Sequence, residues 1–353
     1  MRDRKDSEQT VATAGGRRWV VGEIETAAGR VPRVATCLTW RDRMGAMAMR
    51  WGIGRDRYKV APGLYAVGNP TGESPLLASA NYKLSFDVLR EAMDGLDAWL
   101  LVLDTKGINV WCAAGKGTFG TEELIQRLVV TEASRVAGGA PLVLPQLGAP
   151  GIAAHEVRRR TGLRVVYGPV RASDLPAYLR HGMRAAPAMR QVQFTLRDRL
   201  AVVPVEVVQR LIPCLLVMLS LFLAAGLGRH GYHLAMAQWP GIALAVWVNF
   251  LAGIALTPAL LPWLPGRSFA LKGAGMGVMT GAALWLFRRY GLAEGLGVGL
   301  LSMASCSFLG LMFTGCTPYT SASGVRREIR WAIPLQIAAA AVGLVLWVLT
   351  RWR

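Results

Sequence analysis

The sequence predicts an α/β domain followed by an all-α bundle of five transmembrane helices. Residues 1–205 mix charged, apolar and turn-forming residues as a globular domain does, whereas residues 206–353 are apolar stretches separated by short polar connections. Between residues 70 and 182, short apolar runs alternate with helical patterns. This alternation is typical of an α/β domain with a largely parallel sheet.

The N-terminal half divides into three parts. Residues 1–34 lack the apolar core of a signal peptide and are expected to form a flexible segment. The α/β domain is expected at 35–185. Residues 186–205 are expected to form a linker, within an arginine-rich stretch, 171–203, that resembles an amphipathic segment at a membrane surface.

The elements of the α/β domain follow from its apolar patterns. Short apolar runs predict buried strands at 98–104, 141–145 and 164–167. Helical patterns predict helices at 121–137, 152–161 and 172–180. Glycines, prolines and aromatic residues predict strands and turns at 50–70 and 78–89. The loops that follow parallel strands, 143–151 and 167–174, are then the expected ligand-binding edge.

The C-terminal domain, 206–353, contains stretches long enough to cross a bilayer, which takes about 20 apolar residues in a helix. These stretches are 211–227, 239–264, 269–287, 295–315 and 331–350. Pro258 and Pro262 predict a broken or re-entrant end to the second stretch. With the N-terminal domain inside, basic residues are more numerous in the inner loops, which predicts a multi-pass protein of the inner (cytoplasmic) membrane with its N-terminal domain in the cytoplasm.

Charge and cysteine content exclude several classes of protein. The chain carries a net charge of +18, and both halves are basic. Because basic residues beside membrane spans commonly reflect topology and attraction to anionic lipid, membrane lipid is the expected partner and nucleic acid is not. Five scattered cysteines without a CxxC motif argue against a disulfide framework and a structural zinc site.

Residues 107–124, GINVWCAAGKGTFGTEEL, admit several interpretations. Gly115, Gly117 and Gly120 have the spacing of a dinucleotide-binding fingerprint, but the acidic residue expected about 20 positions later is missing. A Walker A loop is excluded because Lys116 is followed by Gly117 and position 110 is valine. Cys112 is either a buried, inert thiol or, near a helix start with Lys116 one turn later, a reactive thiolate or metal ligand.

The stretch from Asn109 to Lys116, NVWCAAGK, matches residue for residue the cap-helix motif of the membrane-bound corrinoid methyltransferase of microbial mercury methylation. The flanking segments ASANYKLSFD and LDTKGIN, the five predicted spans and the Thr- and Gly-rich segment 313–328 extend this resemblance over nearly the whole chain. The sequence also resembles, more distantly, the corrinoid iron-sulfur protein of the acetyl-CoA pathway.

This resemblance implies a Rossmann-like corrinoid-binding domain that holds a base-off, cobalamin-type corrinoid. Cys112 would be the catalytic residue and the lower axial ligand of cobalt. The neighbouring residues would form the cap over that face of the ring: Asn109, Val110, Trp111, Ala113, Ala114, Gly115 and Lys116. Small side chains at Ala113 and Ala114 would let the helix lie close to the flat macrocycle. Further corrinoid contacts are expected from position alone at Ser79, Asn81, Gln146, Gly148, Ala149, Gly151, Tyr167 and Gly168.

The implied function is transfer of methyl from a methyl-cobalt(III) corrinoid to Hg(II), which forms methylmercury. A thiolate opposite the methyl group donates electron density to cobalt and favours transfer to an electrophile. The resemblance implies a ferredoxin-like electron donor with two four-iron, four-sulfur clusters and a methyltetrahydrofolate-linked methyl donor. Two alternatives remain: a membrane-attached corrinoid methyl carrier of one-carbon or acetyl-CoA metabolism, and a cofactor-free, thiol-dependent membrane transporter or sensor.

The remaining cysteines and histidines have weaker interpretations. Cys306 and Cys316 are either packing residues or a soft-metal relay. His230 and His233 are expected to be solvated in an outer loop. His155, on a predicted helix, is an alternative cobalt ligand that no motif supports.

Overall fold

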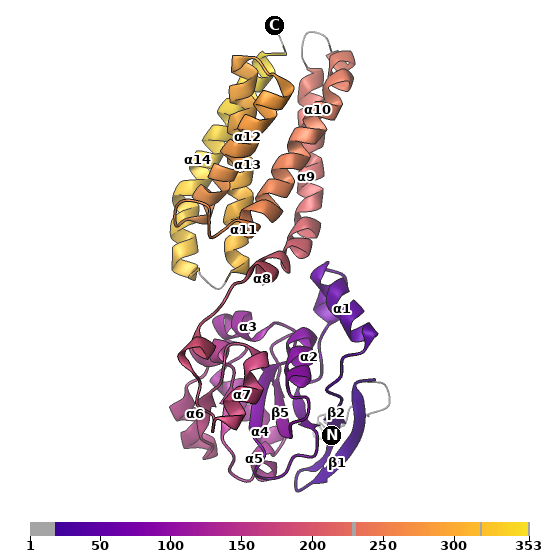
Figure 1. The fold of residues 1–353 in the computed structure, drawn as a ribbon, viewed down its shortest axis with the longest axis vertical. Coiled ribbons are helices and arrows are strands. Elements are labelled where there is room, and N and C mark those ends of the chain that lie inside the picture. Colours follow the sequence, from indigo (N-terminus) through magenta and orange to yellow (C-terminus); the bar gives the residue numbers. More distant parts are fainter. Residues whose placement is uncertain (1–17, 228–230, 318–319, 352–353) are drawn as a thin grey trace, which may run out of the picture. The chain divides into compact units, whose positions relative to one another are not determined.

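The computed structural model describes residues 18–227, 231–317 and 320–351. The chain forms two compact units (Figure 1). The first comprises Met1–Met49 and Ile53–Val192, and the second comprises Arg50–Gly52 and Gln193–Arg353. Of the predicted N-terminal segment, residues 1–17 lie outside the described residues.

The first unit contains a seven-stranded sheet with the order β1-β2-β3-β5-β4-β6-β7. The strands are β1 Val20–Thr26, β2 Gly29–Val34, β3 Gly63–Val67, β4 Leu76–Ala80, β5 Ala98–Leu103, β6 Leu142–Leu144 and β7 Val165–Tyr167. Strands β5, β4, β6 and β7 are parallel, but β1 pairs antiparallel with β2 and β3 pairs antiparallel with β5. The expectation of a largely parallel sheet therefore applies to one side of a mixed sheet.

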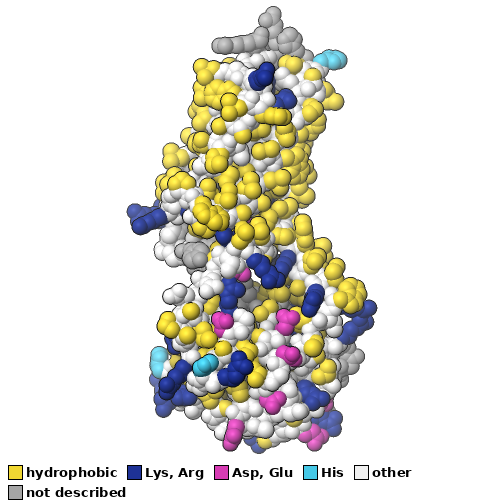
Figure 2. All heavy atoms as spheres, viewed as in Figure 1, with side chains coloured by type: hydrophobic (Ala, Val, Ile, Leu, Met, Phe, Trp, Pro, Cys, Tyr) yellow, Lys and Arg dark blue, Asp and Glu magenta, His cyan; other side chains and the backbone are white. Residues whose placement is uncertain are grey.

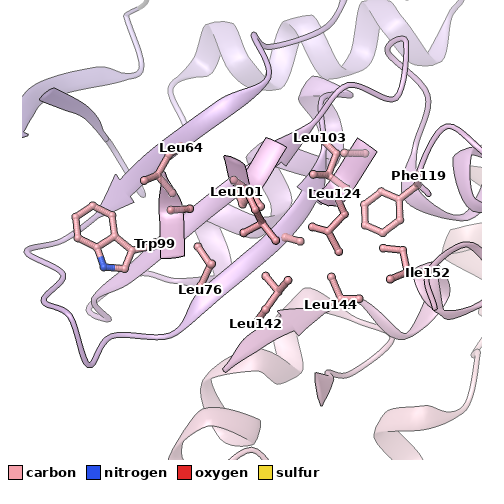
Figure 3. Packing of buried hydrophobic residues seen from close by; sticks show 14 of the residues in the cluster. Leu64, Leu76, Trp99, Leu101, Leu103, Phe119, Leu124, Leu142, Leu144 and Ile152 are labelled. Carbon is pink, nitrogen blue, oxygen red and sulfur yellow. The ribbon is translucent and has the colours of Figure 1, made fainter. Parts of the chain in front are cut away.

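Helices cover both faces of this sheet. They are α1 Trp40–Arg50, α2 Lys83–Ala92, α3 Val110–Lys116, α4 Thr121–Val130, α5 Ala133–Val136, α6 Ala154–Thr161 and α7 Leu175–Arg180, with 3-10 turns η1 Arg55–Arg57, η2 Gln146–Gly151, η3 Ala172–Asp174 and η4 Pro187–Arg190. One core joins the sheet to α3–α6 through residues such as Leu101, Phe119 and Leu124 (Figure 3). A second core joins the other face to α2 and α7 through Phe86 and Tyr178.

The predicted alternation of strands and helices from residue 98 onward is confirmed, with two differences in detail. The predicted helix 121–137 is interrupted where Glu132 adopts a left-handed conformation, φ 47°. The predicted helix 172–180 begins as the 3-10 turn η3. The predicted flexible segment 1–34 contains the hairpin β1–β2, which is held by pairing of β2 with β3.

Two helices lie where strands, turns or no element was predicted. Helix α2 occupies Lys83–Ala92 and overlaps the segment 78–89, and α1 ends where the segment 50–70 begins. The basic residues of α2 are paired with acidic ones: Lys83 and Arg90 contact Asp42 of α1 at 2.8 and 3.1 Å. They also contact Asp87, one turn away, at 2.6 and 2.9 Å. Long-range pairing thus allows a charged segment to pack as a helix.

This ion network also shifts the ionisation of Asp42. Burial by itself would raise the pKa of its carboxyl, but hydrogen bonds from Lys83 and Thr39 outweigh burial and hold the pKa well below its usual range. Asp42 therefore stabilises the folded unit at neutral pH, and this contribution is lost as the pH falls through the lowered pKa.

The second unit is helical. Its elements are α8 Leu196–Leu200, α9 Val203–Gly226, α10 Gly231–Leu251, the π-helix η5 Ala252–Leu256, α11 Thr257–Ala259, α12 Phe269–Arg288, α13 Leu292–Met312, the 3-10 turn η6 Phe313–Cys316 and α14 Ala322–Leu349. Among the described residues, five helical stretches are long and apolar enough to cross a membrane: Leu196–Gly226, Gly231–Ala259, Phe269–Arg288, Leu292–Gly315 and Ser323–Leu349. Figure 2 shows that hydrophobic side chains dominate the visible surface of this unit.

Glycine allows close packing of helices inside this unit. A Cβ atom at Gly273 would lie 2.3 Å from the carbonyl oxygen of Cys306, so α12 and α13 approach each other at backbone distance. Part of the predicted linker also belongs to this unit, because Arg199 of α8 donates hydrogen bonds to the carbonyl oxygens of Pro258 and Ala259. The segment after residue 195 is therefore a packed helix, not a linker.

Replacing Arg90, whose side chain is fully buried, by methionine should leave Asp42 and Asp87 short of counter-charge. The expected cost to the stability of the first unit is about 3–5 kcal/mol. Amide hydrogen exchange of α1 and α2 in the full chain measures it. Arg135→Met, which removes an exposed ion pair with Glu132, is the control and should cost no more than about 1 kcal/mol. Equal effects of the two changes would contradict a structural role for the network.

Candidate functional site

The candidate site lies at the carboxyl edge of the parallel strands. Strand β4 is joined to β5 by α2 on one face, and β5 is joined to β6 by α3–α5 on the other, while β6 pairs with β4. The chain therefore changes direction between β4 and β6. In open α/β sheets, ligands bind at such a switch point, outside the carboxyl ends of the strands.

Asn81, directly after β4, organises this edge. Its side-chain oxygen accepts hydrogen bonds from the backbone amides of Thr105 and Gly107, at 3.1 and 2.9 Å, and from the Thr105 hydroxyl at 2.9 Å. Its amide nitrogen donates to Asp104 at 3.1 Å. Asn81 is 2% exposed, so these contacts fix the loop that leads from β5 to α3 without help from solvent.

The loop itself carries a charged pair. Asp104 accepts a hydrogen bond from Lys106, at 2.6 Å, and its backbone amide donates to Glu123 of α4 at 2.8 Å. Burial raises the pKa of Asp104, but the hydrogen bonds from Lys106 outweigh burial and lower it overall. Asp104 therefore remains ionised at neutral pH and holds the turn before α3.

Helix α3 presents Cys112 through a fixed backbone. The Asn109 side chain caps the helix and accepts a hydrogen bond from the Cys112 amide at 2.9 Å. Gly117 ends the helix in a left-handed conformation, φ 79°. Gly115 is thus inside α3, and no strand-to-helix turn is formed by the three glycines. This geometry argues against the dinucleotide-binding interpretation.

The two sides of α3 differ in their contacts. Ala113 and Ala114 are buried in the core, whereas Cys112 is half-buried and Gly115 and Lys116 are exposed. Val110 and Trp111 are also half-buried. The small residues Ala113 and Ala114 were expected to face a macrocycle. They face the protein instead, because the helix packs on the loop η2.

The loop η2 brings four of the predicted residues next to α3. A Cβ atom at Gly151 would lie 2.2 Å from the Phe119 carbonyl oxygen and 3.2 Å from the Ala114 Cα, and one at Gly148 would lie 2.5 Å from the Phe119 ring. Ala149 is half-buried between them. The Gln146 side-chain oxygen is buried and has no hydrogen-bond partner among the described residues, which leaves an acceptor for a ligand.

The other predicted residues have structural contacts. Tyr167 ends β7 and donates a hydrogen bond to the Ile152 carbonyl oxygen at 2.9 Å. The Gly168 amide donates to the Leu144 carbonyl oxygen at 2.8 Å. Ser79 lies on β4 two residues from Leu77, whose side chain belongs to the core on the α2 and α7 face. The Ser79 side chain therefore points away from the face that carries α3, and the structure does not bring it to Cys112.

The other cysteines and histidines named above lie away from α3 and η2, or outside the residues that the structure describes. Cys306 is fully buried and donates a hydrogen bond to the Asn249 carbonyl oxygen at 3.3 Å, which fits a packing role. The Cys316 side chain and His230 lie outside the described part of the chain, so the relay and the histidine pair stay predictions. His155 is exposed on α6. No group of three or more His, Cys, Asp or Glu side chains that could hold a metal ion occurs among the described residues.

Three residues that hold the loops around α3 in place were not recognised from the sequence. Asn81 was named only as a ligand contact, and Phe119 and Thr105 were not named at all. The signal for Asn81 was its position immediately after a buried strand, where a side chain can satisfy the backbone of the neighbouring loop. Nothing comparable marks Phe119, because its contacts with η2 are distant in sequence.

Comparisons with known proteins relate the first unit to a class of acetyl-CoA-metabolising complexes. Residues 38–179 match the family model described as the CO dehydrogenase/acetyl-CoA synthase delta subunit. The gamma subunit of the acetyl-CoA decarbonylase/synthase complex from Methanopyrus kandleri is 31% identical over 127 residues, which are 35% of this chain and 27% of that subunit. The corresponding subunit from Methanothermobacter thermautotrophicus is 30% identical over 141 residues, 38% of this chain and 30% of that subunit.

The family match covers most of the described α/β unit and includes Cys112, Asn81 and the loop η2. The chain spans between a quarter and about three tenths of the length of the curated relatives it matches. The chain is therefore similar, at modest identity, to part of these subunits.

The packing of α3 on η2 predicts different effects for two glycine substitutions. Gly151→Ala should separate the two segments, because the added Cβ would overlap the Phe119 carbonyl oxygen. Amide exchange within α3 should then become faster. Gly115→Ala is the control: the space beside Gly115 is open, and alanine is more stable than glycine in a helix by about 0.5–1 kcal/mol, so exchange should slow. Unchanged exchange in the Gly151 variant would show that the close approach does not position α3.

Proposed function

We propose that the chain is a membrane-attached corrinoid protein that takes part in methyl transfer. One observation carries the proposal: α3 presents the half-buried Cys112 at the carboxyl edge of the sheet, in a unit homologous to subunits of an acetyl-CoA decarbonylase/synthase complex. The match of the segment from Asn109 to Lys116 to the cap-helix motif indicates a corrinoid as the ligand. The five apolar helices support attachment to a membrane, with the α/β unit proposed on the cytoplasmic side.

The residues present fit a corrinoid in two respects. Cys112, Gly115 and Lys116 recur at helical spacing, so they share the open side of α3, and a Cβ atom at Gly115 would meet nothing within 4 Å. A flat ring can therefore approach this side closely. The unpartnered oxygen of Gln146 can accept a hydrogen bond from an amide side chain of the macrocycle. A corrin ring would supply most of the cobalt ligands itself, so Cys112 alone would be enough to hold the metal to the protein.

Each side chain of the site then has a defined task. A bound corrinoid would supply a cobalt centre that accepts and releases methyl groups. Cys112 would ligate the cobalt through its sulfur atom, and Lys116 lies on the same exposed side of α3. Asn109 would keep the thiol in place by holding the Cys112 amide, and Asn81 would hold the loop before it. Electrons and methyl groups would come from a ferredoxin-like partner with two four-iron clusters and a methyltetrahydrofolate-linked donor.

Two methyl acceptors are compatible with this site. The homology to acetyl-CoA decarbonylase/synthase subunits supports the methyl carrier of one-carbon metabolism, which was the alternative prediction, more than it supports mercury methylation. Hg(II) is the second candidate, and the NVWCAAGK motif favours it. A thiolate below the ring pushes electron density toward the methyl group and so suits an electrophilic acceptor. The remaining alternative, a cofactor-free transporter or sensor, predicts no visible corrinoid absorption in the purified protein.

Cys112→Ala should remove the lower ligand and change the visible spectrum of the bound corrinoid. Methyl transfer should fall at least about 100-fold, because even residues that only support a metal ligand typically contribute 10–100-fold. Cys112→His offers a nitrogen ligand and should not restore the spectrum of the native protein. Cys37→Ala, at an exposed cysteine, is the matched control and should leave the spectrum and methyl transfer unchanged. A native spectrum in the Cys112→Ala variant would refute ligation by this residue.

The acceptor can be identified with the full chain loaded with methylcorrinoid. If Hg(II) is the acceptor, a single-turnover reaction with Hg(II) should yield about one methylmercury per corrinoid, and Cys112→Ala should abolish most of it. If the protein is a one-carbon carrier, an anionic nucleophile such as a cobalt(I) or nickel centre should accept the methyl group faster than Hg(II). Methyl release to Hg(II) at equal rates in the native and alanine proteins would show that mercury is an adventitious acceptor.

A further inference from the structure

Helix α1, marked in Figure 1, carries large apolar side chains that are exposed. Trp40, Met44 and Met47 are 68%, 49% and 53% exposed. At 100° per residue, these three positions fall within an arc of about 60° on the helix. Ile53, three residues after the end of the helix, is exposed as well. The outward side of α1 is thus a continuous apolar stripe, which a helix at a solvent-exposed surface does not normally display.

The opposite side of α1 is fixed to the protein, so the stripe cannot turn inward. Asp42 pairs with Lys83 and Arg90, and the Tyr58 hydroxyl donates a hydrogen bond to the Asp42 carbonyl oxygen at 3.2 Å. Gly45 packs on the Tyr58 ring, because a Cβ atom at Gly45 would lie 2.9 Å from it. Met49 is 3% exposed. These three positions share one helix face and hold the apolar stripe outward.

Arginines line the sides of the stripe. Arg41 and Arg43 are exposed and lie about 70–90° from its centre, and Arg55 and Arg57 follow in the turn η1. The acidic residue of the helix, Asp42, is on the inner side and already paired. The outer surface of α1 therefore combines tryptophan, methionine and positive charge without an opposing carboxylate on that helix.

We propose that this surface binds anionic lipid, with the apolar stripe in the headgroup region of a bilayer and the arginines on lipid phosphates. Aromatic and apolar residues on one face with flanking arginines are the features of an interfacial helix. Charge complementarity favours an anionic lipid surface over a second copy of this basic chain, because two copies would bring like charges together.

The connection between the units makes weak binding sufficient. The first unit ends at Val192, and the first helix that is long enough to cross a membrane begins at Leu196. A short tether holds the α/β unit at a high effective concentration relative to the bilayer, so a modest affinity of α1 for lipid keeps it bound. Surface binding by α1 would then restrict the orientation of the unit that carries Cys112.

Hydroxyl-radical footprinting of the full chain tests the proposal. The protein is placed in nanodiscs of phosphatidylcholine alone or with added phosphatidylglycerol, and methionine oxidation is measured by mass spectrometry. Oxidation of Met44 and Met47 should fall at least about threefold when the anionic lipid is present, because the stripe then leaves water. Met49, buried on the same helix, is the internal reference for intact folding and should remain unoxidised in both lipids.

Charge variants separate lipid binding from other causes of protection. Arg41→Gln combined with Arg43→Gln should abolish the effect of phosphatidylglycerol, whereas Arg158→Gln combined with Arg180→Gln, at exposed positions of α6 and α7, should not. Equal oxidation with and without anionic lipid would overturn the proposal. Protection that persists in detergent and rises with protein concentration would also overturn it and identify a second protein surface as the occupant.

Discussion

The side chain of Asn81 connects the sheet to the candidate site. Polar backbone groups become unpaired where parallel strands end, and a buried edge must satisfy them with side chains. Asn81 does so for Thr105 and Gly107, which lie beyond the end of the neighbouring strand β5. The same contacts set the start of α3 and hence the place of Cys112. The position of the Cys112 thiol is therefore set first by the edge of the sheet and then by the helix that carries it.

Helix α3 is too short to be stable by itself, since isolated helices shorter than about 12 residues are marginal in water. It is held at each end and along one side: by the Asn109 cap, by Gly117, and by the packing of Ala113 and Ala114 on η2. The small side chains of Ala113 and Ala114, on the inner side of α3, allow this packing. Only Gly115 leaves open space on the outer side, which makes it the position where a flat ligand can come closest.

The predictable parts of this molecule are those that depend on continuous apolar runs. Strands β5, β6 and β7 and the five apolar helices follow from such runs, and the loop 143–151, expected at the carboxyl edge of the strands, does lie beside α3. Helix α2 was not predicted because its lysine and arginine pair with Asp42, which is 41 residues from Lys83, in addition to Asp87 of the same helix. The inward orientation of Ala113 and Ala114 was also missed, since a motif lists residues without stating which side of the helix meets the core.

The extent of the homology separates the function of the site from its membrane attachment. The family match begins at residue 38, two residues before α1, and ends at 179, within α7. It therefore includes Cys112 and its supporting residues, and none of the five apolar helices. The proposed methyl-transfer site therefore lies in the α/β unit, in the part of the chain that the family model matches. The five apolar helices support the separate proposal of membrane attachment.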